Sequence, residues 1–199
     1  AVHLNTAYEH SRSLGRLFEK YGISAMLSLP ITEHVAVHIG PEVRGVLLGL
    51  VEAYQELDAW DYAEQCLELL QKLEPDDVVV KLSLAELLLA ARPGDRSVCQ
   101  RVVQLTKDVD NESELHAALL LYKAQALRVL GLDTAARDAL TAGLRRTKDR
   151  SEELLRALRY ERALVYETLG RKSRARSEVE KFYAEAPDYE DVEARLGIS

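Results

Sequence analysis

LGLVEAYQELDAWDYAEQCLELLQKLEPDD, residues 48–77, decides the fold of this chain. Apolar side chains recur in it at intervals of three and four residues, which is the spacing of one face of an α-helix. Asp58 falls at a break in the pattern and Pro75 ends it, because proline cannot continue a helix. The stretch therefore predicts two helices joined by a tight turn near Asp58.

The same arrangement returns twice further along the chain. Three alanines mark the repeat, and each stands five positions after a residue that suits a turn: Ala63 after Asp58, Ala136 after Gly131, and Ala175 after Gly170. Small residues on facing helices let two antiparallel helices approach closely. Such a pair cannot bury its outer faces alone, so we expect helix pairs stacked on one another.

These units resemble the tetratricopeptide repeat (TPR). In the first and last units, residues stand where that family expects them: Leu50, Tyr54, Trp60, Ala63, Leu67 and Pro75, then Ala163, Tyr166, Gly170, Ala175, Phe182 and Pro187. The stretch LYKAQALRVLGLDTAARDALTAGLRR, residues 121–146, is similar but closes without a proline. The resemblance implies a mainly α, right-handed α-solenoid of about four antiparallel helix pairs over residues 41–199. The closing segment also looks like the ends of bacterial proteins of this class.

Two irregularities interrupt the repeat. The interval from Ala63 to Ala136 leaves room for one more unit with a period of about 34 residues. In that unit, residues 92–95 predict a longer turn, and Val98 replaces the small alanine. The interval from Ala136 to Ala175 predicts extended helices or a longer loop near residues 146–151. Residues 188–197 predict a short capping helix, with Val192 and Leu196 facing inward and acidic residues outward.

Residues 1–40 have a different pattern. Apolar side chains up to Tyr21 predict a helix over about His3–Lys20. Period-two alternation then lies on both sides of residues 32–34 and predicts a β-hairpin, in which Pro30 would take an unpaired position. An irregular apolar loop is the alternative. Because an isolated hairpin is marginally stable, we expect residues 1–40 to pack on the helices of residues 41–199.

The chain lacks the sequence patterns of a catalytic or metal site. No Gly-rich phosphate loop, nucleophile elbow or zinc-type spacing occurs, so we predict a non-enzymatic protein without cofactor or metal. His34 and His38 would lie about 13 Å apart on a strand, too far to share one ion, and we expect them to be exposed. Cys66 and Cys99 suggest buried free thiols in a reducing cytoplasm. The apolar stretches are too short for membrane insertion, and the net charge of −7 argues against a general nucleic-acid binder.

The family resemblance also implies a binding surface. In repeats of this class the first helix of each unit lines a concave groove in which partners dock. The family register assigns twelve residues to it: Leu48, Glu52, Gln55, Leu82, Glu86, Leu89, Leu121, Gln125, Arg128, Tyr160, Leu164 and Glu167. Members that clamp a terminal carboxylate carry Lys, Arg and Asn in this register. Leu and Glu stand there in this chain, which disfavours that role.

The groove has an apolar row that should not remain in water: Leu48, Leu82, Leu121 and Tyr160. An amphipathic helix or extended peptide of another protein could cover it. Alternatively the chain's own first forty residues could do so, which we favour because the hairpin also needs an apolar surface. Between residues 145 and 176 stand 11 basic and 5 acidic residues. Arg156, Arg159 and Arg162 would lead a basic patch there, but we favour a solvated helix surface with arginine–glutamate pairs.

The sequence leaves three hypotheses for function. The first is a bacterial cytoplasmic scaffold or adaptor that binds another protein or peptide in the groove. The second is a structural module or homo-oligomer whose groove is filled by its own N-terminus. The third is a binder of an acidic ligand or nucleic acid through the arginine-rich C-terminal repeats.

Overall fold

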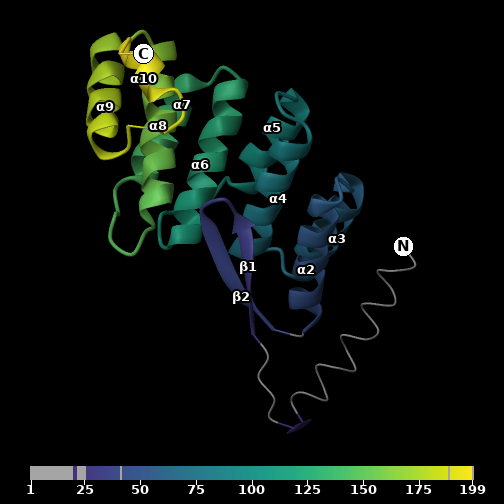
Figure 1. Cartoon of the computed structure of the whole chain (residues 1–199). Helices are drawn as coiled ribbons and strands as arrows, with labels where there is room; N and C mark the ends of the chain where they lie inside the picture. Colours follow the sequence, from purple (N-terminus) through teal and green to yellow (C-terminus); the bar gives the residue numbers. More distant parts are fainter. Residues whose placement is uncertain (1–19, 22–25, 41, 188, 199) are drawn as a thin grey trace. The chain divides into compact units, whose positions relative to one another are not determined.

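The computed structural model describes residues 20–21, 26–40, 42–187 and 189–198 (Figure 1). Within these ranges the elements are β1 (Leu27–Thr32), β2 (Val35–Ile39), α2 (Val43–Glu56), α3 (Trp60–Leu73), α4 (Val78–Ala91), α5 (Arg96–Leu105), α6 (Glu114–Val129), α7 (Asp133–Gly143), α8 (Glu152–Thr168), α9 (Lys172–Glu185) and α10 (Val192–Leu196). The helix predicted over His3–Lys20 lies outside the described residues, except that Lys20 and Tyr21 are helical. The predicted mainly α fold with an N-terminal hairpin is confirmed.

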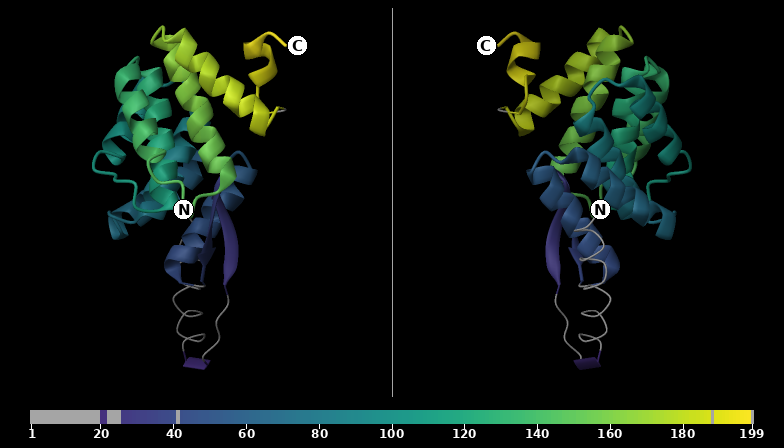
Figure 2. Two further views of the ribbon diagram at one scale, coloured as in Figure 1. Left: turned by 90° about the vertical axis from the view of Figure 1, so that its left-hand side faces the viewer. Right: turned by 90° about the vertical axis from the view of Figure 1, so that its right-hand side faces the viewer.

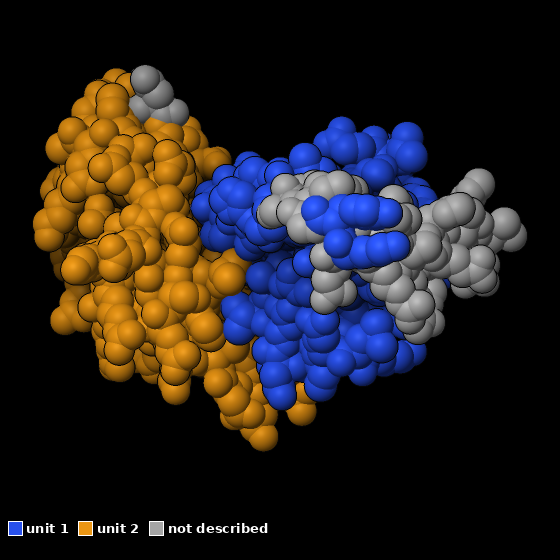
Figure 3. Space-filling view, turned by 90° about the horizontal axis from the view of Figure 1, so that it is seen from below, with its two compact units in different colours: residues 1–91 blue, residues 92–199 orange. Residues whose placement is uncertain are grey.

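The chain divides between Ala91 and Arg92 into two compact units, which Figure 3 colours separately. In unit 1, α2 packs on α3 and α3 on α4, and the hairpin also belongs to this unit. In unit 2, each helix from α5 to α10 packs on the next one along the chain (Figures 1 and 2). Packing between successive helices is what a protein built of helix pairs requires. The domain boundary predicted near residue 40 stays a prediction.

The small residues that mark the repeat lie at the helix contacts. Ala63 and Ala136 have no exposed surface, and Ala175 keeps only 2%. On the first helices of the last two pairs, Ala124 and Ala163 are also buried. A larger side chain at any of these positions would push the helix axes apart. The close approach of paired helices, predicted from these residues, is confirmed.

The turns within the helix pairs share a residue in the left-handed backbone region. Asp58, Gly131 and Gly170 have φ angles of 54°, 79° and 69°. Each lies in a three-residue turn, at 57–59, 130–132 or 169–171. Residues 92–95 form a four-residue turn with Gly94 at φ 79°, which confirms the longer turn predicted there. An L-residue in this region costs about 1–2 kcal/mol, and aspartate tolerates it better than most.

Exchanging glycine and non-glycine residues at these turns should therefore change the stability of the protein. We expect Asp58→Gly to raise the free energy of unfolding by up to about 1 kcal/mol and Gly131→Ala to lower it by about 1 kcal/mol. A Cβ at Gly131 would meet no atom within 4 Å, so the effect isolates the backbone. Urea denaturation followed by circular dichroism measures both changes. Equal stability of wild type and Gly131→Ala would contradict this account of the turn.

The hairpin is antiparallel and has one apolar face. Leu27 lies opposite Ile39, and the register slips between Pro30 and Thr32. The inward side chains alternate along both strands and are buried or half-buried: Leu29, Ile31, Val35, Val37 and Ile39. Leu27 does not follow them, because it is 70% exposed. Pro30 lies opposite Ala36 beside the register slip and not at an unpaired position, and such irregularities tolerate a residue without an N–H group.

The chain closes on a small core at its last helix. Val192 of α10 is fully buried and packs with Val179 and Phe182 of α9. This confirms the predicted capping helix and its inward valine. Before α8, residues 144–151 form a loop after α7, so the insertion predicted near residues 146–151 is a longer loop and not an extension of the helices.

Candidate interaction surface

In unit 1 three of the predicted groove positions, Leu48, Glu52 and Gln55, lie beneath the hairpin. β1 packs on α4 and β2 on α2. Leu29 and Ile31 line, together with Leu48, a cavity of only about 10 Å³, no more than a single water molecule needs. Leu48 and Leu82 keep 1% and 0% of their surface exposed. The chain's own hairpin therefore occupies the face that the repeat register assigns to the groove in this unit.

A carboxylate with a perturbed pKa lies at the same face. The Gln55 amide donates to Oε2 of Glu86 at 3.1 Å, and both side chains are half-buried. Burial raises the pKa of Glu86, the hydrogen bond from Gln55 opposes this, and the negative charges of Glu52 and Glu33 raise the pKa further. Burial and the neighbouring Glu56 raise the pKa of Glu52 in the same way. Ionised carboxylates are thus disfavoured at this face.

This shift predicts how stability depends on pH. Because the pKa of Glu86 in the folded protein lies above its ordinary value, the folded state holds the proton more tightly than the unfolded state. The stabilising contribution is complete below the ordinary pKa and is lost as the pH rises through the raised pKa. We expect Glu86→Gln to reduce the loss of stability over that interval, measured by urea denaturation at a series of pH values. Glu153→Gln, at an exposed position, is the control, and identical pH profiles for Glu86→Gln and wild type would contradict the prediction.

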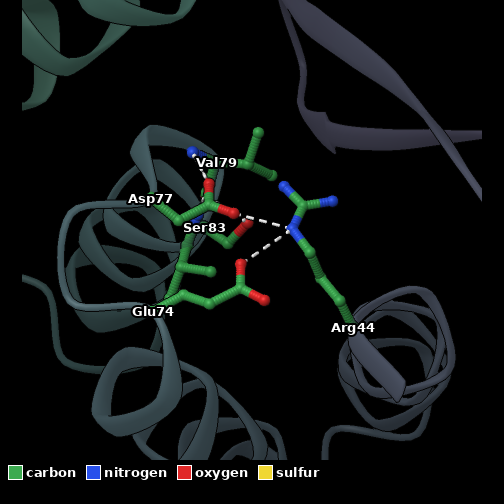
Figure 4. A network of polar contacts seen from close by, with 6 residues as sticks. Arg44, Glu74, Asp77, Val79 and Ser83 are labelled. Carbon is green, nitrogen blue, oxygen red and sulfur yellow. Dashed lines mark hydrogen bonds and ion pairs between the residues drawn. The ribbon is translucent and has the colours of Figure 1, made fainter. Parts of the chain in front are cut away.

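A second polar network in unit 1 positions helices rather than forming a site (Figure 4). Nε of Arg44 on α2 donates to Oδ2 of Asp77 at 2.6 Å and lies 3.4 Å from Oε2 of Glu74. Oδ1 of Asp77 accepts from the backbone N–H groups of Val79 and Val80 at 2.7 and 3.3 Å, so Asp77 caps the start of α4. Burial would raise the pKa of Asp77, but the hydrogen bond from Arg44 helps to lower it below its usual value. The network therefore ties α2 to the beginning of α4.

In unit 2 three predicted groove residues come together from two neighbouring helices. Nε of Arg128 on α6 donates to Oε1 of Glu161 on α8 at 2.5 Å. Gln125 lies one turn before Arg128, and Leu164 lies one turn after Glu161. Gln125 and Leu164 are half-buried, and the Arg128 side chain is 36% exposed. We call Gln125, Arg128 and Leu164 the α6–α8 face; Leu121, which the register also assigns to the groove, is buried.

Two further predicted groove positions, Tyr160 and Glu167, are engaged by the end of the chain. The Tyr160 hydroxyl donates to Oδ1 of Asp191 at 2.5 Å, and burial together with this bond raises the pKa of Tyr160 to about 12. Arg195 on α10 pairs with Asp191 and with Glu167, and its guanidinium lies 5.8 Å from the centroid of the Tyr160 ring. The capping helix thus contacts Tyr160 and Glu167.

The sequence analysis did not predict these pairings, although a signal for them existed. Four pairs of polar partners are separated by 31 or 33 residues: Arg44 and Asp77, Gln55 and Glu86, Arg128 and Glu161, Tyr160 and Asp191. This separation is close to the TPR period of about 34 residues. A search for complementary side chains 31–33 residues apart would have included all four pairs.

The three arginines singled out in the sequence are all paired with glutamates. Arg156 lies 3.1 Å from Glu152, Arg159 lies 2.9 Å from Glu185, and Arg162 donates to both carboxylate oxygens of Glu178 at 2.8 and 2.9 Å. Their charges are therefore balanced locally, as the favoured interpretation of the sequence expected.

The histidines and cysteines occupy ordinary positions. His34 lies in the hairpin turn with its side chain 15% exposed, so the expectation of an exposed strand residue was wrong for it, whereas His38 on β2 is exposed. Cys66 and Cys99 are buried free thiols, and burial raises the pKa of Cys66 to about 11. Within the described ranges, no three His, Cys, Asp or Glu residues gather as metal ligands would. No helix in the described part of the chain has the length and apolar character to cross a membrane.

Comparison with known proteins identifies the fold. No protein-family model matches the sequence, and no curated protein matches it. The structure is similar to the crystal structure of a thermophilic TPR protein of Thermus thermophilus, with a TM-score of 0.59 and 20% sequence identity. The similarity covers 79% of this chain and 81% of that one. Together with the helix pairs and the small residues at their contacts, it shows that this chain has the fold of a tetratricopeptide-repeat protein.

Proposed function

We propose that this chain is a non-enzymatic scaffold that binds a peptide segment of another protein. Stacked helix pairs form extended surfaces on which such repeat proteins hold partners. One observation carries the proposal: on the α6–α8 face, where Arg128 of α6 is bonded to Glu161 of α8, the side chains of Gln125, Arg128 and Leu164 keep part of their surface exposed. In unit 1, by contrast, the corresponding face is covered by the hairpin.

The chemistry of the α6–α8 face suits a peptide. Among the described residues, Arg128 donates to Glu161 through Nε alone, so the other N–H groups of the guanidinium can donate to carbonyl oxygens of a bound segment. Gln125 supplies both a donor and an acceptor, and Leu164 supplies an apolar contact. A peptide with an apolar side chain next to exposed backbone carbonyls would match these three groups.

Site-specific photo-crosslinking tests the proposal. A photo-crosslinking residue replaces Gln125 or Leu164 in the full chain, and cross-linked proteins are identified by mass spectrometry after exposure to lysate of the source cells. Asp138 on α7, 64% exposed, is the control position. We expect the same segment of one protein to be cross-linked from positions 125 and 164 but not from position 138. An excess of the unmodified chain should abolish this cross-linking. Cross-linking that is equal at all three positions, or absent from all, would refute the proposal.

A second candidate function rests on the hairpin. Because the hairpin covers Leu48 with the chain's own residues, the protein could be a structural module that associates with itself. Sedimentation velocity over a range of concentrations separates the two functions. A single species of monomer mass favours the scaffold, and a concentration-dependent dimer favours self-association.

The proposed setting is the cytoplasm of a bacterium. Cys66 and Cys99 are both free and buried, in keeping with a reducing compartment. The resemblance of the closing segment to bacterial repeat proteins supports the source.

A further inference from the structure

We propose that unit 2 has a second binding site, which takes the carboxylates of an acidic peptide segment. The site is the hollow between the loop 144–151, the first turns of α8 and the end of α9, and we call it the arginine hollow. Its lining residues are Thr147, Arg150, Glu152, Leu155, Arg156, Arg159 and Glu185. The inference rests on the proposed function, since the acidic segment would belong to the protein partner.

The hollow has the size of a ligand site. Its volume is about 670 Å³, within the range of about 300–1,000 Å³ that is usual for such sites. A smaller hollow of about 240 Å³ shares Arg159 and Glu185 with it and extends along α9. Several consecutive residues of an extended peptide could therefore be accommodated.

Arg150 is the residue that points to an anion. Its Nη2 donates to Oδ1 of Asn111 at 3.0 Å, and its Nη1 donates to the carbonyl oxygen of Asp149 at 3.1 Å. Both acceptors are neutral, and among the described residues no carboxylate pairs with Arg150. Its Nε is buried and has no hydrogen-bond partner there. Each terminal nitrogen also has a second N–H group, with which the guanidinium can donate to an incoming carboxylate.

Arg150 is also held in place before any ligand arrives. Nδ2 of Asn111 donates to the carbonyl oxygens of Ala142 and Gly143 at 2.9 and 2.7 Å, at the end of α7. Asn111 is thereby fixed, and its Oδ1 fixes Arg150. Pre-positioning of a side chain lowers the entropy that binding would otherwise cost.

Two further arginines can join Arg150. Arg156 pairs with Glu152, whose side chain is 82% exposed, and Arg159 pairs with Glu185, which is 54% exposed. Ion pairs with such exposed partners contribute only about 0–1 kcal/mol, so a ligand carboxylate can replace the glutamate. The guanidinium fork binds a carboxylate through two parallel hydrogen bonds.

The composition of the hollow favours an acidic peptide over nucleic acid. Glu152 and Glu185 remain on its wall and would repel a continuous row of phosphates. The lining contains no aromatic side chain on which a base could stack, and such stacking supports the binding of single strands. Separate carboxylates can instead be placed beside individual arginines.

The position of the hollow agrees with the irregularity of the repeat. Thr147 and Arg150 belong to the loop 144–151, the insertion that lengthens the interval from Ala136 to Ala175. In repeat proteins, insertions of this kind map to loops on one face, which is often the binding face. The residues that break the period are thus the ones that complete the hollow.

Fluorescence anisotropy tests the proposal with a fluorescein-labelled octapeptide of alternating Asp and Glu. Arg150→Gln is compared in the full chain with Arg146→Gln, which removes the same charge from an exposed position of the same loop. We expect Arg150→Gln to raise the dissociation constant at least about tenfold, because a charged hydrogen bond is lost, and Arg146→Gln to change it less than about twofold. Arg156→Gln, which removes an exposed ion pair and leaves the fold intact, should also weaken binding.

Four outcomes would overturn the proposal. The first is that the wild-type chain does not bind the peptide, and the second is that Arg150→Gln and Arg146→Gln weaken peptide binding equally. The third is that Arg156→Gln binds the peptide as tightly as the wild type does. The fourth is that a labelled single-stranded oligonucleotide binds more tightly than the peptide and depends on Arg150. Circular dichroism verifies that each variant is folded. The cross-linking experiment at positions 125 and 164 does not involve Arg150. Failure of the peptide-binding experiment would therefore contradict only the site in the arginine hollow, whereas failure of the cross-linking experiment would contradict the scaffold function.

Discussion

Replacing Phe182 with alanine is expected to lower the free energy of unfolding by about 3–5 kcal/mol. Phe182 is 4% exposed and packs against Val192 of α10. Its ring centroid lies 4.9 Å from that of Tyr189 and 6.2 Å from that of Tyr160. Alanine would remove both aromatic contacts and leave a cavity beneath the capping helix. Urea denaturation followed by circular dichroism measures the loss.

The control for this variant keeps most of the volume. Phe182→Leu is expected to cost less than about 1.5 kcal/mol, because an apolar side chain of similar size still fills the space. If Phe182→Ala were as stable as Phe182→Leu, the aromatic cluster could not be what holds α10 in place.

The second large effect is expected at the ion pair between α6 and α8. Arg128→Ala should lower the free energy of unfolding by about 3 kcal/mol, because it leaves the charge of Glu161 buried and unpaired. The Glu161 side chain is only 7% exposed, so water cannot replace the guanidinium well. The double variant Arg128→Leu with Glu161→Leu removes both charges and should recover most of the loss. Urea denaturation of both variants gives the comparison.

Arg176 provides the matched control for Arg128. It pairs with Glu180 four residues later on α9, and the two side chains are 67% and 55% exposed. Arg176→Ala should cost less than about 0.5 kcal/mol, since exposed pairs of this kind contribute little. If Arg128→Ala lowered the free energy of unfolding as little as Arg176→Ala, the buried charge of Glu161 would not need its partner Arg128 for stability.

The helix pairs were predictable because local rules and packing rules agree there. Asp58, Gly131 and Gly170 were assigned to turns from their spacing before Ala63, Ala136 and Ala175, and all three have positive φ. The alanines were assigned to helix contacts, and they are buried. Backbone conformation and residue size are properties of single positions, so a single sequence reveals them.

The surfaces were less predictable because they depend on residues far apart in the chain. That the hairpin lies on α2 and α4 was one of two alternatives, since apolar periodicity shows that Leu48 needs cover but not which segment provides it. The partners Glu161 and Asp191 were missed because one charged side chain on a helix has no local pattern. The neutral environment of Arg150 depends on Asn111, which lies 39 residues earlier.

The predicted groove therefore has parts that the chain's own residues cover and a part that stays partly exposed. Leu48 and Glu86 lie at the face that the hairpin covers, and Tyr160 and Glu167 are in contact with the residues of the capping end. On the α6–α8 face, Gln125, Arg128 and Leu164 remain partly exposed and, among the described residues, form no hydrogen bond or ion pair with the capping end. This division is the central claim behind the proposed function.

Amide hydrogen exchange of the full chain with and without Ile31→Asp tests that claim most directly. Ile31 is 9% exposed and lines the cavity shared with Leu48 and Val51, so an aspartate there should detach the hairpin from its face. We expect faster exchange in α2 around Leu48 and Val51 and in α4 around Ser83 than in the unmodified chain. Unchanged exchange in α2 and α4 would contradict it, because the hairpin could not then be what covers that face.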